Sequence, residues 1–442
     1  MVSAAWVQGS NAGQIASSLE GGIAEGRLAA GQQLPTVRAL ADRVGVSPAT
    51  VQAAYRMLRE RGLVAGSGRA GTRVVDRSTG PSRRLAAPLP AGVRNLADGN
   101  PDPALLPALA PALERLSGRH WLYGEPGQLP ALMEWARTDV AGDGLPADHV
   151  LVVGGALDGV ERALQAHVRP GDAVAVEDPG YGGVLDLVAA LGLRGVPVPV
   201  DRQGMTPEGL ERALEQRPAA CVLTPRAQNP TGAALSEARA VELAELLARH
   251  PQVVVIEDDH AGPISGARPV TVAGRGLSPG WVVIRSLTKT LGPDVRTAVL
   301  TGDRRTVGRI DRRQQASAGW VSHVLQELAA TVLTDPATSA LLERARDTYR
   351  QRRQWLTDAL TARGVPVIGE SGFNLWVPVA AEAVVTTALL AQGWAVRAGE
   401  SFRTSSPPGL RITISTLSEA DAAEFAEILG SCVRGSGGST TA

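Results

Sequence analysis

The stretch 285–296, RSLTKTLGPDVR, contains Lys289, the residue that points most directly to the chemistry and the fold of the chain. It follows an apolar run, 281–284, which predicts a buried strand. Lys289 is the single lysine among 44 basic residues, and all the others are arginine. A lysine amine can lose its proton and attack a carbonyl, whereas a guanidinium stays protonated. Either this lysine survived by chance, or the position requires a nucleophilic amine; the second interpretation is favoured.

Four further motifs lie upstream, and each is placed at the end of a predicted strand. They are VVVIEDD at 253–259, QNPTG at 228–232, EDPGY at 177–181, and VVGGALDGVERAL from residue 152, which passes from strand to helix through two glycines. Ligands of α/β proteins bind at the carboxyl ends of parallel strands. The motifs are therefore expected to meet at one edge of a sheet.

Together these motifs meet the requirements of pyridoxal phosphate: a lysine for the Schiff base, an acid facing the ring nitrogen, an aromatic ring to stack, a donor to the ring oxygen, and a phosphate cradle. In that order the candidates are Lys289, Asp258, Tyr181 and Asn229, with the N–H groups of Gly155, Ala156 and Leu157, the Ser286 hydroxyl and Arg296 for the phosphate. Singly, each motif has an ordinary explanation as a turn, a cap or close packing. Their order around the only lysine predicts a cofactor site.

Residues 95–432 resemble the fold-type-I, class I aminotransferases in the order and spacing of these motifs. The resemblance implies that Lys289 is the aldimine lysine and that Asp258, Asn229, Ser286 and Arg296 contact the cofactor. It further implies that Arg411, in GLRITIS, holds a substrate α-carboxylate. Tyr123, in YGEPGQLPAL, would reach the phosphate of a neighbouring subunit, which implies a homodimer with shared sites. One position departs from the family: His260 stands where a tyrosine usually bonds the ring oxygen, and histidine can still donate, in a pH-dependent way.

The first 94 residues differ from the rest in charge. They hold twelve arginines and five acidic residues, a net charge of +7, whereas the whole chain is neutral. Helices are predicted at 12–26, at 37–44 after the cap Thr36, and at 48–61 after the cap Ser47, followed by short strands at 63–64 and 72–75. This order is typical of a winged helix-turn-helix, although a small helical protein-interaction domain has similar elements.

Residues 34–73 resemble the GntR-type DNA-binding domain almost position by position, which favours the DNA-binding interpretation. The second motif helix would enter the major groove. The candidate DNA contacts, to bases or to the phosphate backbone, are Arg38, Ser47, Thr50, Gln52, Arg56 and Arg69.

The predicted organisation is a winged helix-turn-helix at 1–76, a linker at 77–94, an aminotransferase-like domain at 95–434 and a disordered tail at 435–442. The linker holds four arginines, three prolines and no acidic residue. Strands predicted at 150–153, 173–176, 221–224, 253–256, 281–284 and 298–301 alternate with helices, so we expect an α/β fold. Its central sheet should be mostly parallel, with a smaller C-terminal α/β subdomain that has strands at 374–377 and 410–414.

Composition excludes several classes of protein. The chain has 442 residues, of which 44% are hydrophobic and 20% charged, so a wholly disordered or fibrous protein is excluded. Two cysteines, Cys221 and Cys432, are too few for a disulfide framework or a zinc cluster, and they favour a cytoplasmic protein without a metal. Neither a signal peptide nor a membrane-spanning run is expected.

A GntR-type head joined to an aminotransferase-like body resembles the MocR/GabR-type regulators. Several short sequence segments are similar to the PtsJ-like branch of these regulators, in which the implied sensing concerns vitamin B6. The first hypothesis is a transcriptional regulator that binds operator DNA and senses pyridoxal phosphate, or an amine or amino acid bound through it. The alternative is an active aminotransferase with an appended head, and the two are not exclusive. A cofactor-free scaffold conflicts with the intact lysine site.

Overall fold

The structure, a computed structural model, describes residues 6–29, 31–60, 63–65, 71–74, 89–276 and 280–437. Its contacts separate the chain into two units, one built around the residues up to 85 and one containing most residues from 86 onward. We call residues 6–74 the head and residues 89–437 the body. The expected domain boundary at 76–77, most of the expected linker and the last five residues of the expected tail lie outside the described residues.

The head consists of three helices and a two-stranded antiparallel ribbon: α1 Ala12–Ala24, α2 Val37–Val44, α3 Pro48–Glu60, β1 Val64–Ala65 and β2 Arg73–Val74. Both expected caps form, because the Thr36 and Ser47 hydroxyls each accept a hydrogen bond from the backbone N–H three residues on, at 3.2 Å. Gly45 joins α2 to α3 with φ +69°, a conformation that glycine adopts without strain. The predicted winged helix-turn-helix is confirmed.

The body is organised around a large sheet whose strands within the described residues run in the order β4-β11-β10-β9-β8-β5-β6-β7. β5, β8, β9 and β10 pair in parallel, one with the next. β11 is antiparallel to both β10 and β4, so β4 points the same way as β10. The sheet is thus mixed: β11 is antiparallel to both of its neighbours, and β7 is antiparallel to β6. The strands are β4 Val150–Val153, β5 Ala173–Asp178, β6 Arg194–Asp201, β7 Gly204–Met205, β8 Ala220–Leu223, β9 Val254–Asp259, β10 Trp281–Ser286 and β11 Ala298–Gly302.

All six strands predicted for this sheet are present, and their ends lie within three residues of the expected ones, because each is a short apolar run buried on both faces. The strand β6 was not predicted. Its exposed and buried residues alternate in part, and it contains Pro197 and Pro199, which are typical of strands near a sheet edge.

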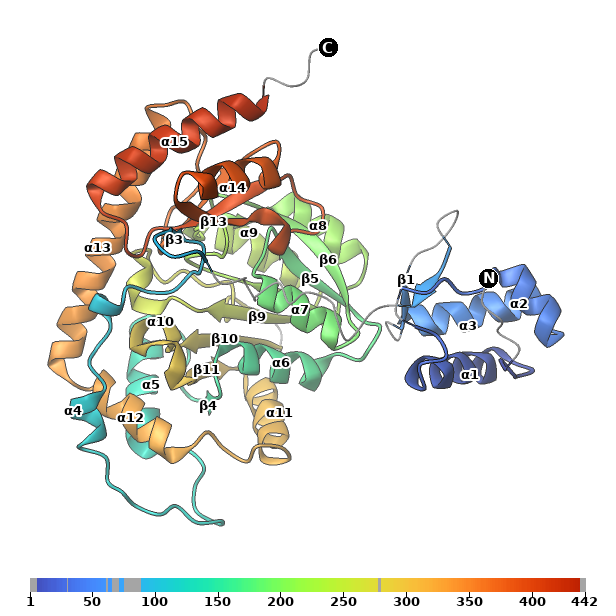
Figure 1. The fold of residues 1–442 in the computed structure, drawn as a ribbon. Helices are drawn as coiled ribbons and strands as arrows, with labels where there is room; N and C mark the ends of the chain where they lie inside the picture. Colours follow the sequence, from blue (N-terminus) through green and yellow to red (C-terminus); the bar gives the residue numbers. More distant parts are fainter. Residues whose placement is uncertain are drawn as a thin grey trace. The chain divides into compact units, whose positions relative to one another are not determined.

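Helices surround the sheet (Figure 1). α6 and α11 contact each other and the strands β4, β10 and β11, while α5 contacts β4 and α12. Among the described residues, no helix combines the length and the apolarity needed to cross a membrane. The helices of the body are α4 Ala110–Leu113, α5 Pro130–Gly142, α6 Ala156–His167, α7 Gly182–Ala190, α8 Pro207–Glu215, α9 Glu237–Ala248, α10 Thr288–Leu291, α11 Arg304–Gln315, α12 His323–Leu333, α13 Pro336–Thr361, α14 Glu382–Ala391 and α15 Glu419–Gly437.

A second, four-stranded sheet has the order β12-β14-β13-β3, with bounds Asn374–Pro378, Gly409–Thr413, Trp394–Ala398 and Arg94–Leu96. The expected small subdomain therefore exists, but it includes β3 from the start of the body. Arg94, expected to end the linker, instead begins this strand: its guanidinium lies 3.7 Å from the Trp394 ring centre and pairs with Asp421 at 2.9 Å. α13 and α15 contact each other along this region (orange and red, Figure 1). α15 continues to Gly437, so 435–437 belong to a helix and not to a disordered tail.

Candidate cofactor site and DNA-contacting head

Lys289 lies on the short helix α10, directly after β10, as the sequence predicted. Its Nζ donates a hydrogen bond to the carbonyl oxygen of Gly99 at 2.8 Å. Burial, and then the positive charge of Arg411, lower the pKa of Lys289 to about 8, against the opposing effect of Asp258. A lysine with a lowered pKa has a larger fraction of neutral amine at physiological pH, which is the form that attacks a carbonyl.

Asp258 occupies the end of β9, paired in register with Ile284 of β10, and is only 4% exposed. Its Oδ1 is buried and has no hydrogen-bond partner within the described residues. Burial, followed by the charges of Asp259 and Glu177, raises the pKa of Asp258 to about 7. A buried acceptor without a donor is costly, and the protonated ring nitrogen of pyridoxal phosphate would be a suitable donor.

A cradle of small residues lies where the phosphate was expected. Gly155 precedes the first turn of α6 with φ +109°, and a Cβ atom placed there would lie 3.5 Å from Arg296 Nη2. The Arg296 guanidinium therefore lies beside the N-terminus of α6, whose first N–H groups, including those of Ala156 and Leu157, have no acceptor within the helix. The Ser286 side chain is buried and accepts from the Thr288 N–H at 3.2 Å. An anion fits such a helix N-terminus with an adjacent cation.

Arg411 lies on β14 and is 5% exposed. It donates to Asn229 Oδ1 at 3.3 Å and to the Ala97 carbonyl oxygen, and its guanidinium lies 4.9 Å from the centre of the Phe402 ring. Its Nε is buried without a partner in the described part of the chain. Burial and the charge of Arg397 lower the pKa of Arg411 to about 10. The carboxylate of a small ligand would supply the missing acceptor.

Gly99 connects these groups and was not singled out from the sequence. Its carbonyl accepts from Lys289, and a Cβ atom at this position would lie 3.2 Å from Arg411 Nη1. Its φ of +70° also requires glycine. The only signal in the sequence is a glycine within the polar turn ADGNPD, which is too common a pattern to mark a site.

Tyr181 and Tyr123 have different surroundings. Tyr181 lies just before α7, and a Cβ at Gly183 would come within 2.7 Å of its ring, so glycine at 183 leaves the ring its space. Tyr123 is 95% exposed and contacts Trp320 edge-on, with ring centres 5.7 Å apart. Tyr123 therefore does not line the site of its own chain, and its expected role in a second subunit stays a prediction.

His260 follows the two aspartates at the end of β9. Its Nε2 lies 2.8 Å from the carbonyl oxygen of Ala227. Burial, and then the charge of Lys289, lower the pKa of His260 to about 4.

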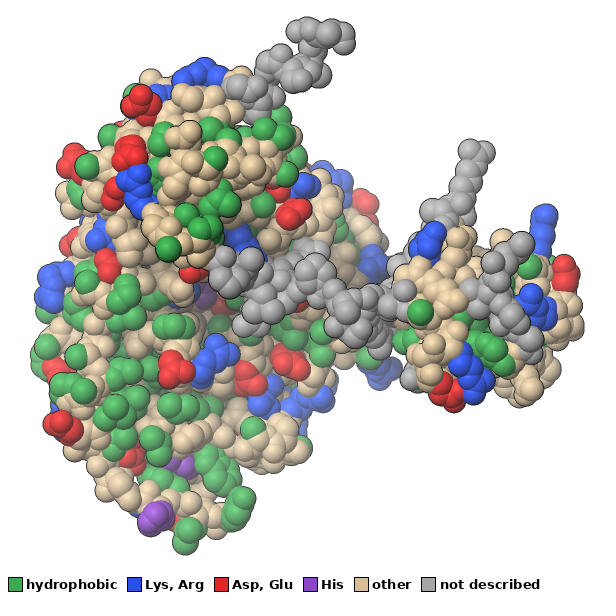
Figure 2. All heavy atoms as spheres, viewed as in Figure 1, with side chains coloured by type: hydrophobic (Ala, Val, Ile, Leu, Met, Phe, Trp, Pro, Cys, Tyr) green, Lys and Arg blue, Asp and Glu red, His purple; other side chains and the backbone are tan. Residues whose placement is uncertain are grey.

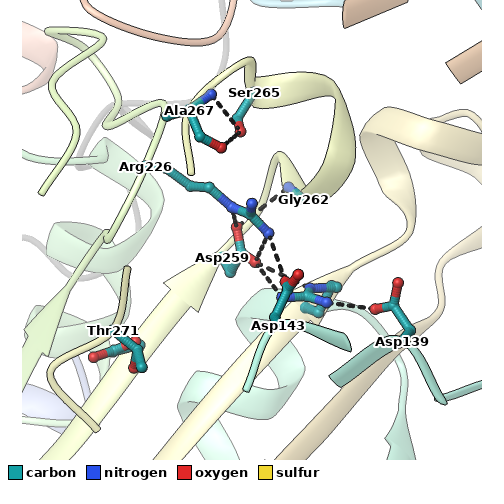
Figure 3. A network of polar contacts seen from close by, with 10 residues as sticks. Asp139, Asp143, Arg226, Asp259, Gly262, Ser265, Ala267 and Thr271 are labelled. Atoms are coloured by element: carbon teal, nitrogen blue, oxygen red, sulfur yellow. Dashed lines mark hydrogen bonds and ion pairs between the residues drawn. The ribbon is translucent and has the colours of Figure 1, made fainter. Parts of the chain in front are cut away.

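A buried charge network lies behind the site and was missed from the sequence (Figure 3). Asp259 accepts from Arg226 at 2.7 and 2.9 Å and from Arg285 at 3.0 Å. Arg285 also pairs with Asp139 of α5 and with Asp143, which directly follows that helix. Since neighbouring residues on a strand point to opposite faces, Asp259 points into the network while Asp258 points away from it. The network joins the ends of β9 and β10 and the loop after β8, which carry Asp258, Ser286 and Asn229. The signal in the sequence was a charged residue at the end of each apolar run.

A second polar cluster joins the EDPGY motif to the small subdomain. The Asp178 carboxylate accepts hydrogen bonds from both the backbone N–H and the hydroxyl of Thr404, Ser405 and Ser406, at 2.7–3.0 Å. The Gly180 N–H donates to the Phe402 carbonyl oxygen at 2.7 Å. These contacts connect the segment that carries Tyr181 to the loop that holds Phe402 against Arg411.

In the head, four of the candidate DNA contacts are exposed, as expected: Arg38 on α2, Ser47 directly before α3, and Gln52 and Arg56 on α3. Thr50 was expected to be exposed but is half-buried, because its hydroxyl bonds the Ser47 hydroxyl at 2.8 Å as part of the cap. Arg69 lies outside the described residues. On the face of the body shown in Figure 2, acidic and basic side chains are interspersed. No group of three or more metal-ligating side chains occurs within the described ranges.

Comparisons with known proteins agree with both halves of this structure. Residues 92–429 match the family "aminotransferase class I and II", and residues 11–74 match "bacterial regulatory proteins, gntR family". The chain is 41% identical, over 94% of its length and 96% of the relative's, to the vitamin B6 salvage pathway transcriptional repressor PtsJ of Salmonella typhimurium. It is 26% identical, over 77% of its length and 75% of the relative's, to the probable rhizopine catabolism regulatory protein MocR of Rhizobium meliloti.

Among solved structures, the α-aminoadipate aminotransferase LysN of Thermus thermophilus, complexed with N-(5'-phosphopyridoxyl)-L-leucine, shares the fold of the body. It superposes with a TM-score of 0.69 at 24% identity and covers 78% of this chain and 93% of that chain. The two resemblances expected from the sequence are thus confirmed. The chain belongs to the GntR-family transcriptional regulators that carry a class I and II aminotransferase domain.

Proposed function

We propose that this regulator holds pyridoxal phosphate covalently through Lys289 and couples the occupancy of that site to the binding of operator DNA by its head. The observation that carries the proposal is the buried Asp258 Oδ1, which has no hydrogen-bond partner among the described residues and lies in the same site as the only lysine of the chain. When bound, the cofactor would supply an aldehyde for Lys289 and a protonated ring nitrogen for Asp258. Both requirements of the site would be met by one ligand.

The remaining residues have defined tasks in this proposal. The N–H groups of Gly155, Ala156 and Leu157, the Ser286 hydroxyl and Arg296 would bind the phosphate. Tyr181 would stack on the ring, and the Asn229 amide would donate to the ring oxygen, since its Oδ1 already accepts from Arg411. Tyr123, exposed on its own chain, would complete the phosphate site of a second copy in a homodimer.

The effector would be a small amine or amino acid. An amine can replace Lys289 at the cofactor, and Arg411 would bind a carboxylate through the side of its guanidinium that has no partner. Because PtsJ is named for vitamin B6 salvage, we propose cofactor supply itself as the first signal to test. In the head, Arg38 would contact the DNA backbone, whereas Gln52 and Arg56 would contact bases.

A second candidate function is transamination, because Lys289, Asp258 and Arg411 are all present. Incubation of the cofactor-loaded protein with a panel of amino acids and a 2-oxo acid acceptor tests it. Steady turnover would establish an enzyme, whereas spectral change without turnover would support a sensor.

The regulator proposal is tested by titrating the DNA upstream of the chain's own gene into cofactor-free and cofactor-loaded protein at fixed salt. We expect the two dissociation constants to differ by about 5- to 150-fold, the usual range of allosteric coupling. Lys289→Ala, the matched control, should bind DNA equally with and without added cofactor. Equal constants for the two wild-type forms would refute the proposal.

A further inference from the structure

His260 donates its only proton away from the cofactor site. The carbonyl oxygen of Ala227, 2.8 Å from Nε2, has no proton to give, so the hydrogen of this bond belongs to Nε2. A neutral imidazole carries one N–H, and its other nitrogen is an acceptor. Nδ1 of His260 therefore has a lone pair and no hydrogen to offer.

The surroundings keep the imidazole neutral. Burial and the positive charge of Lys289, on α10, lower the pKa of His260 to about 4, and they outweigh the opposing effects of the Ala227 carbonyl and of Asp259. Asp259 is itself paired with two arginines. The other charged groups facing Lys289 are Asp258 on β9 and Arg411 on β14. At physiological pH a second proton on His260 is therefore absent.

The acceptor of this bond is held in place by its own neighbours. Ala227 is buried and has φ +52°, an uncommon conformation for a residue with a side chain. Its N–H donates to the Ser371 hydroxyl at 2.7 Å, and Ser371 is itself buried. Turning the Ala227 carbonyl away from His260 would disrupt these contacts.

We propose that His260 is an acceptor-only neighbour of the bound cofactor. The ring oxygen would then receive a hydrogen bond from Asn229 but none from position 260, and the nitrogen that joins Lys289 to the cofactor would keep its proton. This inference rests on the proposed function. A donor to the ring oxygen stabilises its negative charge and so makes the neighbouring N–H more acidic. Without that donor the linkage keeps its proton to higher pH, and it stays open to attack by an incoming amine throughout the physiological range.

The test is a pH titration of the visible absorbance of the cofactor-loaded protein, in the wild type, His260→Tyr and His260→Phe. Tyrosine restores a donor, so the midpoint should fall by about one pH unit or more, the effect of one hydrogen bond to a charged oxygen. Phenylalanine donates nothing, so its midpoint should stay close to that of the wild type. A higher midpoint in His260→Phe than in the wild type, or equal midpoints in His260→Tyr and the wild type, would overturn the inference.

A second measurement reports the position of the proton on the His260 ring directly. Nitrogen-15 chemical shifts of the histidine rings in the loaded wild-type protein should include a neutral ring protonated at Nε2 that is absent from the His260 variants' spectra. If the ring signals assigned to His260 instead show protonation at Nδ1, or at both nitrogens, the inference would be overturned. Absence of any visible band after loading the wild type would be a different result, because it would refute the cofactor site on which the inference rests.

Discussion

Replacing Asp258 by asparagine should stabilise the cofactor-free protein, and the gain should grow with pH. Burial raises the pKa of Asp258 from its ordinary 3.8 to about 7 in the folded state. When the pKa of an acid is higher in the folded than in the unfolded state, its ionisation lowers the free energy of unfolding. This loss of stability grows as pH rises from the unfolded pKa to the folded pKa, and it is constant at higher pH. The two values correspond to a penalty of about 1.5 kcal/mol at pH 5 and about 4 kcal/mol at pH 8. Asparagine carries no charge and avoids this penalty.

The assay is urea unfolding of the cofactor-free wild type and Asp258→Asn at pH 5 and pH 8, followed by tryptophan fluorescence. Seven of the eight tryptophans lie beyond residue 100, so the signal reports on the body. Added cofactor should stabilise the wild type far more than the variant. Asp259→Asn is the matched control: it leaves Arg226 and Arg285 buried without their shared carboxylate, so it should destabilise by about 3–5 kcal/mol. An advantage of Asp258→Asn that is equal at both pH values would refute the reasoning.

Borohydride reduction of the loaded protein should place the cofactor on Lys289, and Lys289→Ala should abolish this adduct; a reduced adduct at neither Lys289 nor the N-terminal amine would contradict the assignment. Arg38→Ala should weaken binding to all DNA sequences and flatten the salt dependence, whereas Gln52→Ala should change sequence preference, both measured by fluorescence anisotropy. Asp178→Ala leaves six donors without their acceptor, so it should lower the free energy of unfolding of the body, measured in urea, by about 2–4 kcal/mol. It should also weaken the binding of carboxylate ligands to the cofactor-loaded protein. Unchanged stability would show that the cluster is not structural.

Much of the site was predictable because its residues are marked by local pattern. Lys289 stands out in a chain that otherwise uses arginine, and Asp258, Asn229 and Ser286 follow short apolar strands. The head was predictable for the same reason, since caps such as Thr36 depend on residues three positions apart. The pairing of β3 with β13 was not predictable in this way, because about 300 residues separate the two strands and three residues carry no periodic signal.

By itself, the sequence determined most of the segments that become helices and strands, the order of the motifs along the chain and the candidate nucleophile, Lys289, because these depend on neighbours within a few positions. Only the tertiary structure decided that Asp258 Oδ1 has no hydrogen-bond partner in the described part of the chain, that Asp259 beside it pairs with two arginines, and that the ring N–H of His260 donates to Ala227. These properties depend on burial and on donors and acceptors brought together from distant segments. A side chain's charge and its free hydrogen-bonding positions follow from that environment and not from its place in the sequence.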